Sequence, residues 1–275
     1  MTGLDDAFQK FERGEKHLVE FDKRIVQKFK KDRIIFEIQA QPYEKPAGDP
    51  LIYWNTYTLY AAYVPVFPKE DGILLGEAIQ CFRSSLDYLA WALATKHSKR
   101  ALRQREKRGI QFPMSPNRKQ FNQNKGKMLL NVPPEQCAFF EQYQPYRRSA
   151  NGRVMRCLQI LSNTDKHRII VPTVLFPNSS VGDISCQGGG IAKAIFHLKP
   201  GAEIRKGTKI LSVIVAGNTA QQTVNVDTKT VVFPMFPKTI IKQSARRDPA
   251  APVEPILKNI RNVCFEILTK SKDYF

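Results

Sequence analysis

The spacing of hydrophobic residues near the start of the chain predicts one long helix over residues 4–31. Apolar side chains recur there near a heptad spacing, at Leu4, Phe8, Phe11, Leu18, Ile25 and Phe29. A stripe this narrow packs either on the protein's own core or on a second copy of the chain. We favour packing within the chain, with a homodimer through this helix as the alternative.

Two runs with a β-like pattern follow, over residues 33–40 and 57–67. The segment between them, QPYEKPAGDP, is rich in proline, glycine and acidic residues, which favour turns. The pattern therefore predicts a long β-hairpin. The aromatic residues of YWNTYTLYAAY are ordinary strand formers, so packing is the favoured interpretation, and stacking on bases is the alternative.

The clearest helix in the sequence spans residues 74–96. Its apolar positions form a single stripe at the helical period, at Leu75, Ile79, Phe82, Leu86, Leu89 and Leu93. The basic run HSKRALRQREKRG comes next and either extends this helix or forms an exposed loop. Helical patterns return at 117–130 and 134–143, and more strongly at 153–164.

From residue 169 the pattern changes to short β-like runs, at IIVPTVLF, AKAIFHL, TKILSVIVAG and QTVNVDTKTVVF. A proline-rich, charged linker, 243–252, then leads to a closing helix with an apolar stripe over 256–267. We therefore expect an α+β fold. Residues 1–168 would form a helical domain with the hairpin 33–67 inserted, and 169–275 a small antiparallel meander with the C-terminal helix, packed on the first domain as one unit.

Composition narrows the class of protein. The chain has 275 residues, 42% of them apolar, which is enough for a hydrophobic core. No apolar run approaches the roughly 20 residues of a membrane-spanning helix. The five cysteines are odd in number and widely spaced, which indicates free thiols in a reducing, cytoplasmic compartment. No spacing typical of a zinc site occurs, so we expect no metal and no cofactor.

The charge of the chain is concentrated in one segment. The formal net charge is +18, and residues 96–130 hold 11 Lys and Arg against one Glu, a net +10. Residues 34–95 are net −4, with 3 basic and 7 acidic residues. A local basic patch favours RNA or another polyanion as partner. The candidate contact residues are Lys99, Arg100, Arg103, Arg105, Lys107 and Arg108.

Polar residues in two places are candidates for a site. Arg83 and Asp87 are one turn apart on the central helix, at the border of its apolar stripe. Asp165 falls in line with core positions of the helix 153–164, so we expect it to be buried and to need a partner, for which Arg83 is favoured. The alternative is that Asp165 caps a turn, while the basic residues after it complement a helix C-terminus.

A family resemblance is carried by GEAIQCFRSSLDYLAWAL, QFPMS, EQYQPY and LSNTDKHRIIVP. Over roughly residues 70–172 the chain resembles a widespread family of uncharacterised bacterial proteins with RSALDHLA, FP, QPY and DKH motifs. That family's helix is in turn similar to the Arg-x4-His motif of HEPN-type helical domains, many of which are metal-independent ribonucleases. The resemblance implies that Arg83 polarises a scissile phosphate.

At the histidine position of that motif this chain has Tyr88. A tyrosine, with an ordinary pKa of about 10, is a poor general base near neutrality. Either His167 takes the role, with Asp165 or Asp87 orienting the groups, or the chain keeps the fold without the activity. Three hypotheses follow: a HEPN-like endoribonuclease, a non-catalytic nucleic-acid-binding module, and a structural or regulatory partner.

Overall fold

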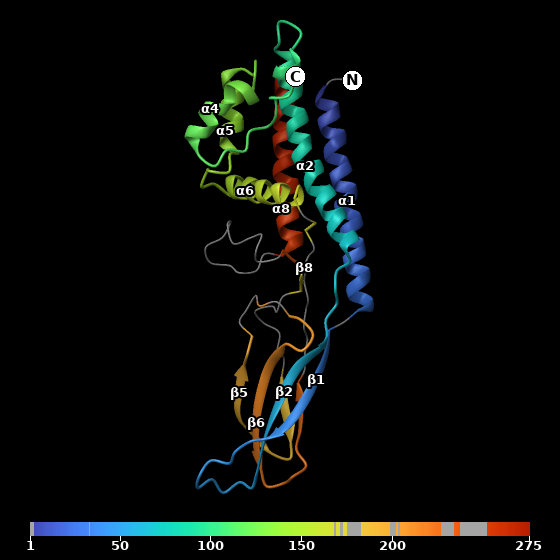
Figure 1. Cartoon of the computed structure of the whole chain (residues 1–275), viewed down its shortest axis with the longest axis vertical. Helices are drawn as coiled ribbons and strands as arrows, with labels where there is room; N and C mark the ends of the chain where they lie inside the picture. The colour runs from blue at the N-terminus through green and yellow to red at the C-terminus, as the bar shows by residue number, and fades with distance from the viewer. Residues whose placement is uncertain are drawn as a thin grey trace.

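The computed structural model describes residues 3–32, 34–167, 169–170, 173–174, 183–198, 202, 204–226, 234–236 and 252–275. The molecule is elongated, with a helical body at one end and a β-sheet at the other (Figure 1). It is therefore an α+β protein, with a long helix at the start and another at the end. No helix in the described ranges combines the length and the apolar character that crossing a bilayer requires.

Three long helices form the centre of the helical body. Helix α1 (Gly3–Lys31) lies along α2 (Lys69–Lys96), and α8 (Val253–Lys270) packs against both. Phe11 of α1 joins them, with its ring centroid 5.4 Å from that of Phe82 and 5.6 Å from that of Phe265. The predicted stripe of α2 is entirely buried. The stripe of α1 also packs within the chain, as we favoured, with Leu4, Phe11 and Ile25 buried.

The sheet has four antiparallel strands in the order β1-β2-β6-β5: β1 (Ile35–Pro42), β2 (Tyr53–Tyr63), β6 (Lys209–Gly217) and β5 (Gly190–Phe196). The predicted hairpin is present as β1 and β2. Strand β2 pairs with β6, where Thr58 lies opposite Ser212 and their hydroxyl oxygens are 3.0 Å apart. A second, smaller core forms on this sheet, with Leu59, Leu211 and Val213 almost fully buried.

Elements from both predicted domains, 1–168 and 169–275, meet in the sheet and in the helical body. The hairpin 33–67, expected as an insertion in the first domain, completes a sheet with strands of the second. The closing helix, expected with the second domain, packs on α2, α6 and α1. The physical reason is that an isolated two-stranded hairpin is marginally stable, and gains stability by joining further strands over a shared apolar face.

Four shorter helices complete the helical body: α3 (Gln104–Lys107), α4 (Arg118–Met128), α5 (Pro134–Gln142) and α6 (Ala150–Asp165). Side chains cap the N-termini of α4 and α6. Asn117 accepts from the backbone N–H of Gln120 at 2.8 Å, and Ser149 accepts from that of Gly152 at 3.1 Å. The basic run is thus neither an extension of α2 nor wholly a loop, since α2 ends at Lys96 and one short helical turn follows.

The remaining strands form two small pairs. Strand β4 (Ile184–Gln187), which the sequence did not predict, pairs with β7 (Thr223–Val226), and β3 (Thr173–Val174) pairs with β8 (Pro234–Met235). A single 3-10 turn, η1 (Ser271–Tyr274), follows α8. Much of the runs predicted over 169–176 and 222–233, and the linker up to residue 251, lies outside the described residues.

Candidate nucleic-acid interface

Arg83 and Asp87 hold the backbone of one residue, Phe112. The Nη2 of Arg83 donates to the carbonyl oxygen of Phe112 at 2.9 Å and lies 3.1 Å from Oδ1 of Asp87. The same carboxylate oxygen accepts from the backbone N–H of Phe112 at 2.8 Å. The one-turn spacing on α2 therefore places a donor and an acceptor side by side, and together they satisfy both polar groups of a single backbone position.

The three residues after Phe112 are held in the same way by two glutamines. Gln144, fully buried just after α5, donates to the carbonyl of Pro113 at 2.9 Å and accepts from the N–H of Ser115 at 3.0 Å. Gln159 of α6 donates to the carbonyl of Met114 at 2.7 Å. We call residues 112–115 the clamped segment, because side chains from α2, α6 and the end of α5 fix its backbone.

Burial dominates the electrostatics of this pair. It lowers the pKa of Arg83, against the opposing effect of Asp87. Burial also raises the pKa of Asp87, against the opposing effects of Arg83, the N–H of Phe112 and Lys166. Only 12% of the Arg83 side chain is exposed, and its Nη1 has no hydrogen-bond partner within the described part of the chain. The guanidinium is thus enclosed and faces the protein's own backbone.

Asp165 does not pair with Arg83 as we expected. It is the last residue of α6, and its carboxylate accepts from Nε2 of Gln80 at 3.2 Å, while the same nitrogen donates to the carbonyl of Ser162 at 2.8 Å. Arg83 pairs with Asp87, and the neutral amide of Gln80 donates to Asp165 instead. Burial raises the pKa of Asp165, Gln80 opposes that shift, and Glu77 adds to it.

The other two candidate catalytic residues lie on the surface. His167 is exposed after the end of α6, where its backbone N–H donates to the carbonyl of Thr164 at 3.0 Å. Tyr88, which the resemblance aligned with the motif histidine, is 45% exposed. The structure therefore brings Arg83 and Asp87 together, and gives neither Asp165 nor His167 a side-chain hydrogen bond or ion pair with them.

The basic segment 96–130 forms an exposed cationic surface, and we call its cations the basic surface. All eleven are exposed: Lys96, Lys99, Arg100, Arg103, Arg105, Lys107, Arg108, Arg118, Lys119, Lys125 and Lys127. Arg100 pairs with Glu106, Arg118 with Glu141, and Lys96 donates to carbonyl oxygens at the C-terminus. The other eight form no ion pair with any described residue. Five of the six predicted contact residues are among these eight.

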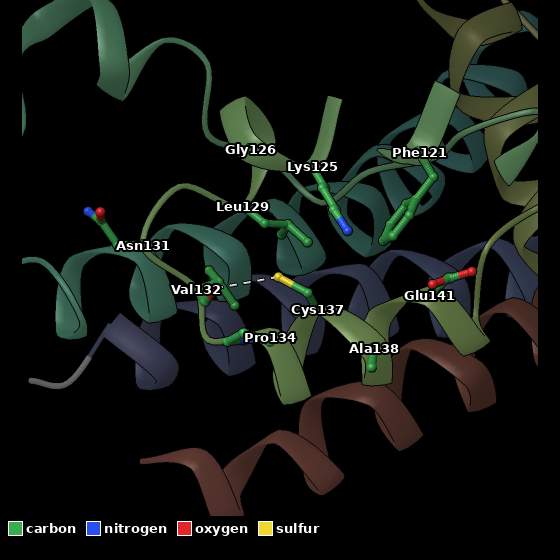
Figure 2. Close-up of a pocket in the computed structure, with 10 residues that line it drawn as sticks. All are labelled: Phe121, Lys125, Gly126, Leu129, Asn131, Val132, Pro134, Cys137, Ala138 and Glu141. Carbon is green, nitrogen blue, oxygen red and sulfur yellow. Dashed lines mark hydrogen bonds between the residues drawn. The ribbon is translucent and has the colours of Figure 1, made fainter. Parts of the chain in front are cut away.

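A pocket of about 380 Å³ lies between α4 and α5, next to this surface (Figure 2). Leu129 and Val132 form its apolar base, and Pro134, Cys137 and Ala138 of α5 line one side. The Cys137 thiol donates to the carbonyl of Val132 at 3.4 Å. Burial raises the pKa of this thiol, so it is protonated at neutral pH. The volume falls within the range of about 300 to 1,000 Å³ typical of ligand pockets.

The sequence did not single out Gln80, Gln144, Gln159 or this pocket. Gln144 had a usable signal, because it belongs to the QPY motif, but a glutamine before a proline is read most simply as part of a turn. Gln80 and Gln159 are single polar residues on amphipathic helices and give no pattern. The pocket arises from two helices that join through a loop, so no spacing along one element reveals it.

Among the described residues, no group of three histidine, cysteine or acidic side chains could hold a metal ion. No protein-family model, no curated protein and no solved structure matches the chain.

Proposed function

We propose that this protein binds RNA through the basic surface, without cleaving it. The observation that carries the proposal is the set of eight exposed cations, within 29 residues of sequence from Lys99 to Lys127, that no acidic side chain of the described chain neutralises. Surface cations left without partners are available to phosphate groups, and releasing the counterions of those phosphates favours binding.

The environment of Arg83 supports binding rather than cleavage. An arginine that polarises a phosphate has to present its N–H groups to the substrate, whereas Arg83 donates to a backbone carbonyl and pairs with Asp87. The general base of a HEPN-type ribonuclease is replaced by Tyr88. In the described part of the chain, no side-chain hydrogen bond or ion pair orients His167, the alternative base, toward Arg83 or Asp87.

The test is the salt dependence of binding to a labelled RNA oligonucleotide, followed by fluorescence anisotropy. The logarithm of the association constant should fall linearly with the logarithm of salt concentration, with a slope of about −0.7 for each phosphate neutralised on a single strand. Replacing Arg105, Lys107 and Arg108 together with glutamine should weaken binding and reduce the steepness of that slope by up to about 2.

A matched control removes the same charge elsewhere. Arg13, Lys16 and Lys23 are exposed on α1, outside the basic surface, and their replacement with glutamine should leave most of the affinity and the slope unchanged. Equal effects of the two triple variants would mean that net charge alone attracts RNA, and would overturn the proposal of a defined surface. RNA incubated with the protein in chelator should stay intact. Cleavage that a folded Arg83→Met variant lacks would overturn the non-catalytic assignment.

A further inference from the structure

The pocket between α4 and α5 adds a second feature to the basic surface. Resting on the proposed function, we propose that this pocket receives one unpaired nucleobase of the bound RNA, while Lys125 holds the adjacent phosphate. The protein would then bind single-stranded RNA in preference to duplex, because a base has to leave its stack and its pairing partner to enter a pocket.

Lys125 links the pocket to the surface. It lines the pocket from α4, it is exposed, and it belongs to the eight cations without an ion pair. Figure 2 shows its side chain extending from α4 toward α5, with its ammonium group above the space that Cys137 borders. A phosphate at this nitrogen would therefore stand at the boundary between the basic surface and the apolar interior of the pocket.

The one carboxylate in the lining does not oppose an anion there. Glu141 forms ion pairs with Arg147 at 2.9 Å and with Arg118 at 3.3 Å, and the Tyr146 hydroxyl donates a hydrogen bond to it at 2.8 Å. Its charge is thus already balanced by two guanidinium groups. Lys125 is left as the unbalanced charge of the lining, which favours a ligand with one negative group.

The rest of the lining fits a flat, mostly apolar group. Leu129, Val132, Pro134 and Ala138 offer hydrocarbon surface, and Asn131 is the one neutral amide side chain that lines the pocket. A base held by apolar contact with so few polar partners is bound for its shape and not for its hydrogen-bonding edge. The pocket should therefore accept different bases, as sequence-tolerant single-strand binders do.

Two pairs of variants test the occupancy of the pocket. Cys137→Phe fills it, and Cys137→Ser keeps the size of the side chain and a donor for the carbonyl of Val132. Gly126→Leu adds an apolar side chain at a second lining position, where a Cβ meets no heavy atom within 4 Å, and Gly126→Ala is its control. Thermal unfolding followed by circular dichroism establishes that each variant used is folded.

The probes are a single-stranded RNA, a duplex of the same length, and a single strand that lacks its bases, each at one fixed salt concentration. The unmodified protein should bind the single strand about tenfold more tightly than the other two. Either filled variant should lose that preference and keep its affinity for duplex, and the serine and alanine controls should keep both.

The outcomes separate this inference from the proposed function. Salt-sensitive binding that is equal for the three probes, or an unchanged preference in both filled variants, would overturn the base pocket and leave the RNA-binding surface standing. Absence of salt-sensitive binding to every probe would overturn both. Displacement of the strand by micromolar uridine monophosphate would also overturn the inference, because the pocket would then serve a free nucleotide.

Discussion

Replacing Arg83 with methionine should destabilise the fold, because Arg83 and Asp87 hold Phe112. The substitution keeps much of the buried hydrocarbon, and it leaves the carbonyl of Phe112 without its donor at 2.9 Å and Asp87 without its cation at 3.1 Å. Removing one partner of a buried ion pair costs about 3–5 kcal/mol. Since 33% of the Asp87 side chain is exposed and water can reach it, we expect a loss of about 2–4 kcal/mol in the free energy of unfolding.

The measurement is urea denaturation of Arg83→Met, Asp87→Asn and the double variant. The two losses should be less than additive, with a coupling energy of about 0.5–3 kcal/mol, because both side chains act on one backbone position. Arg100 and Glu106 provide the control, since their two hydrogen bonds, at 2.6 Å and 2.9 Å, lie at the surface. With 55% of the Arg100 side chain exposed, removing it leaves no buried carbonyl or charge without a partner. Arg100→Met should therefore change the stability little. The reasoning would be refuted if Arg83→Met unfolded at the same urea concentration as the unmodified protein.

Three further predictions concern single contacts. Gly76→Ala should cost about 1–3 kcal/mol in urea denaturation, because a Cβ there would lie 2.0 Å from Oδ1 of Asp165, whereas Gly126→Ala should be neutral or stabilising. Asp165→Asn should gain stability relative to the unmodified protein as pH rises. Because the pKa of Asp165 is higher in the folded than in the unfolded protein, its contribution to the free energy of unfolding is present below the pKa of the unfolded state. That contribution is lost as pH rises through the pKa of the folded state. Comparing the urea midpoints of the two proteins at about pH 4 and pH 7 checks this sign. Ser149→Ala should cost about 1 kcal/mol, measured by thermal unfolding, because it removes the acceptor for the N–H of Gly152 at the start of α6.

Much of the secondary structure was predictable, because amphipathic helices and a hairpin leave periodic signals. The stripe from Leu75 to Leu93 predicted α2, and every member of it is fully buried. The start of α2 was placed five residues late, since Lys69–Ile73 contains charged residues and a glycine that interrupt the pattern. Long-range strand pairing left no such signal. The partner of β2 is β6, about 150 residues later, and only the shared apolar face of the sheet selects it.

The candidate site was predictable in its residues and not in all of their partners. The one-turn spacing puts Arg83 and Asp87 within reach of each other on the helix, and their ion pair forms at 3.1 Å. The partner of Asp165 was predicted wrongly, because a charge-based argument looks for a cation. A partly buried carboxylate can also accept a hydrogen bond from a neutral amide such as Gln80. Sequence shows which residue needs a partner, and three-dimensional packing decides which side chain is near enough.

Three of the sequence segments that carried the resemblance meet at one place, and the fourth, with Asp165 and His167, does not join them. Arg83 and Asp87 on α2, Phe112 and Pro113, and Gln144 after α5 come from these three segments. Their hydrogen bonds converge on the clamped segment. That segment connects α3 to α4, so it fixes the path of the chain between the two halves of the basic surface. These hydrogen bonds therefore have a structural role, because they fix the backbone between α3 and α4. It follows that a loss of RNA binding in an Arg83 variant has to be compared with its loss of stability before any direct contact with RNA is assigned to this residue.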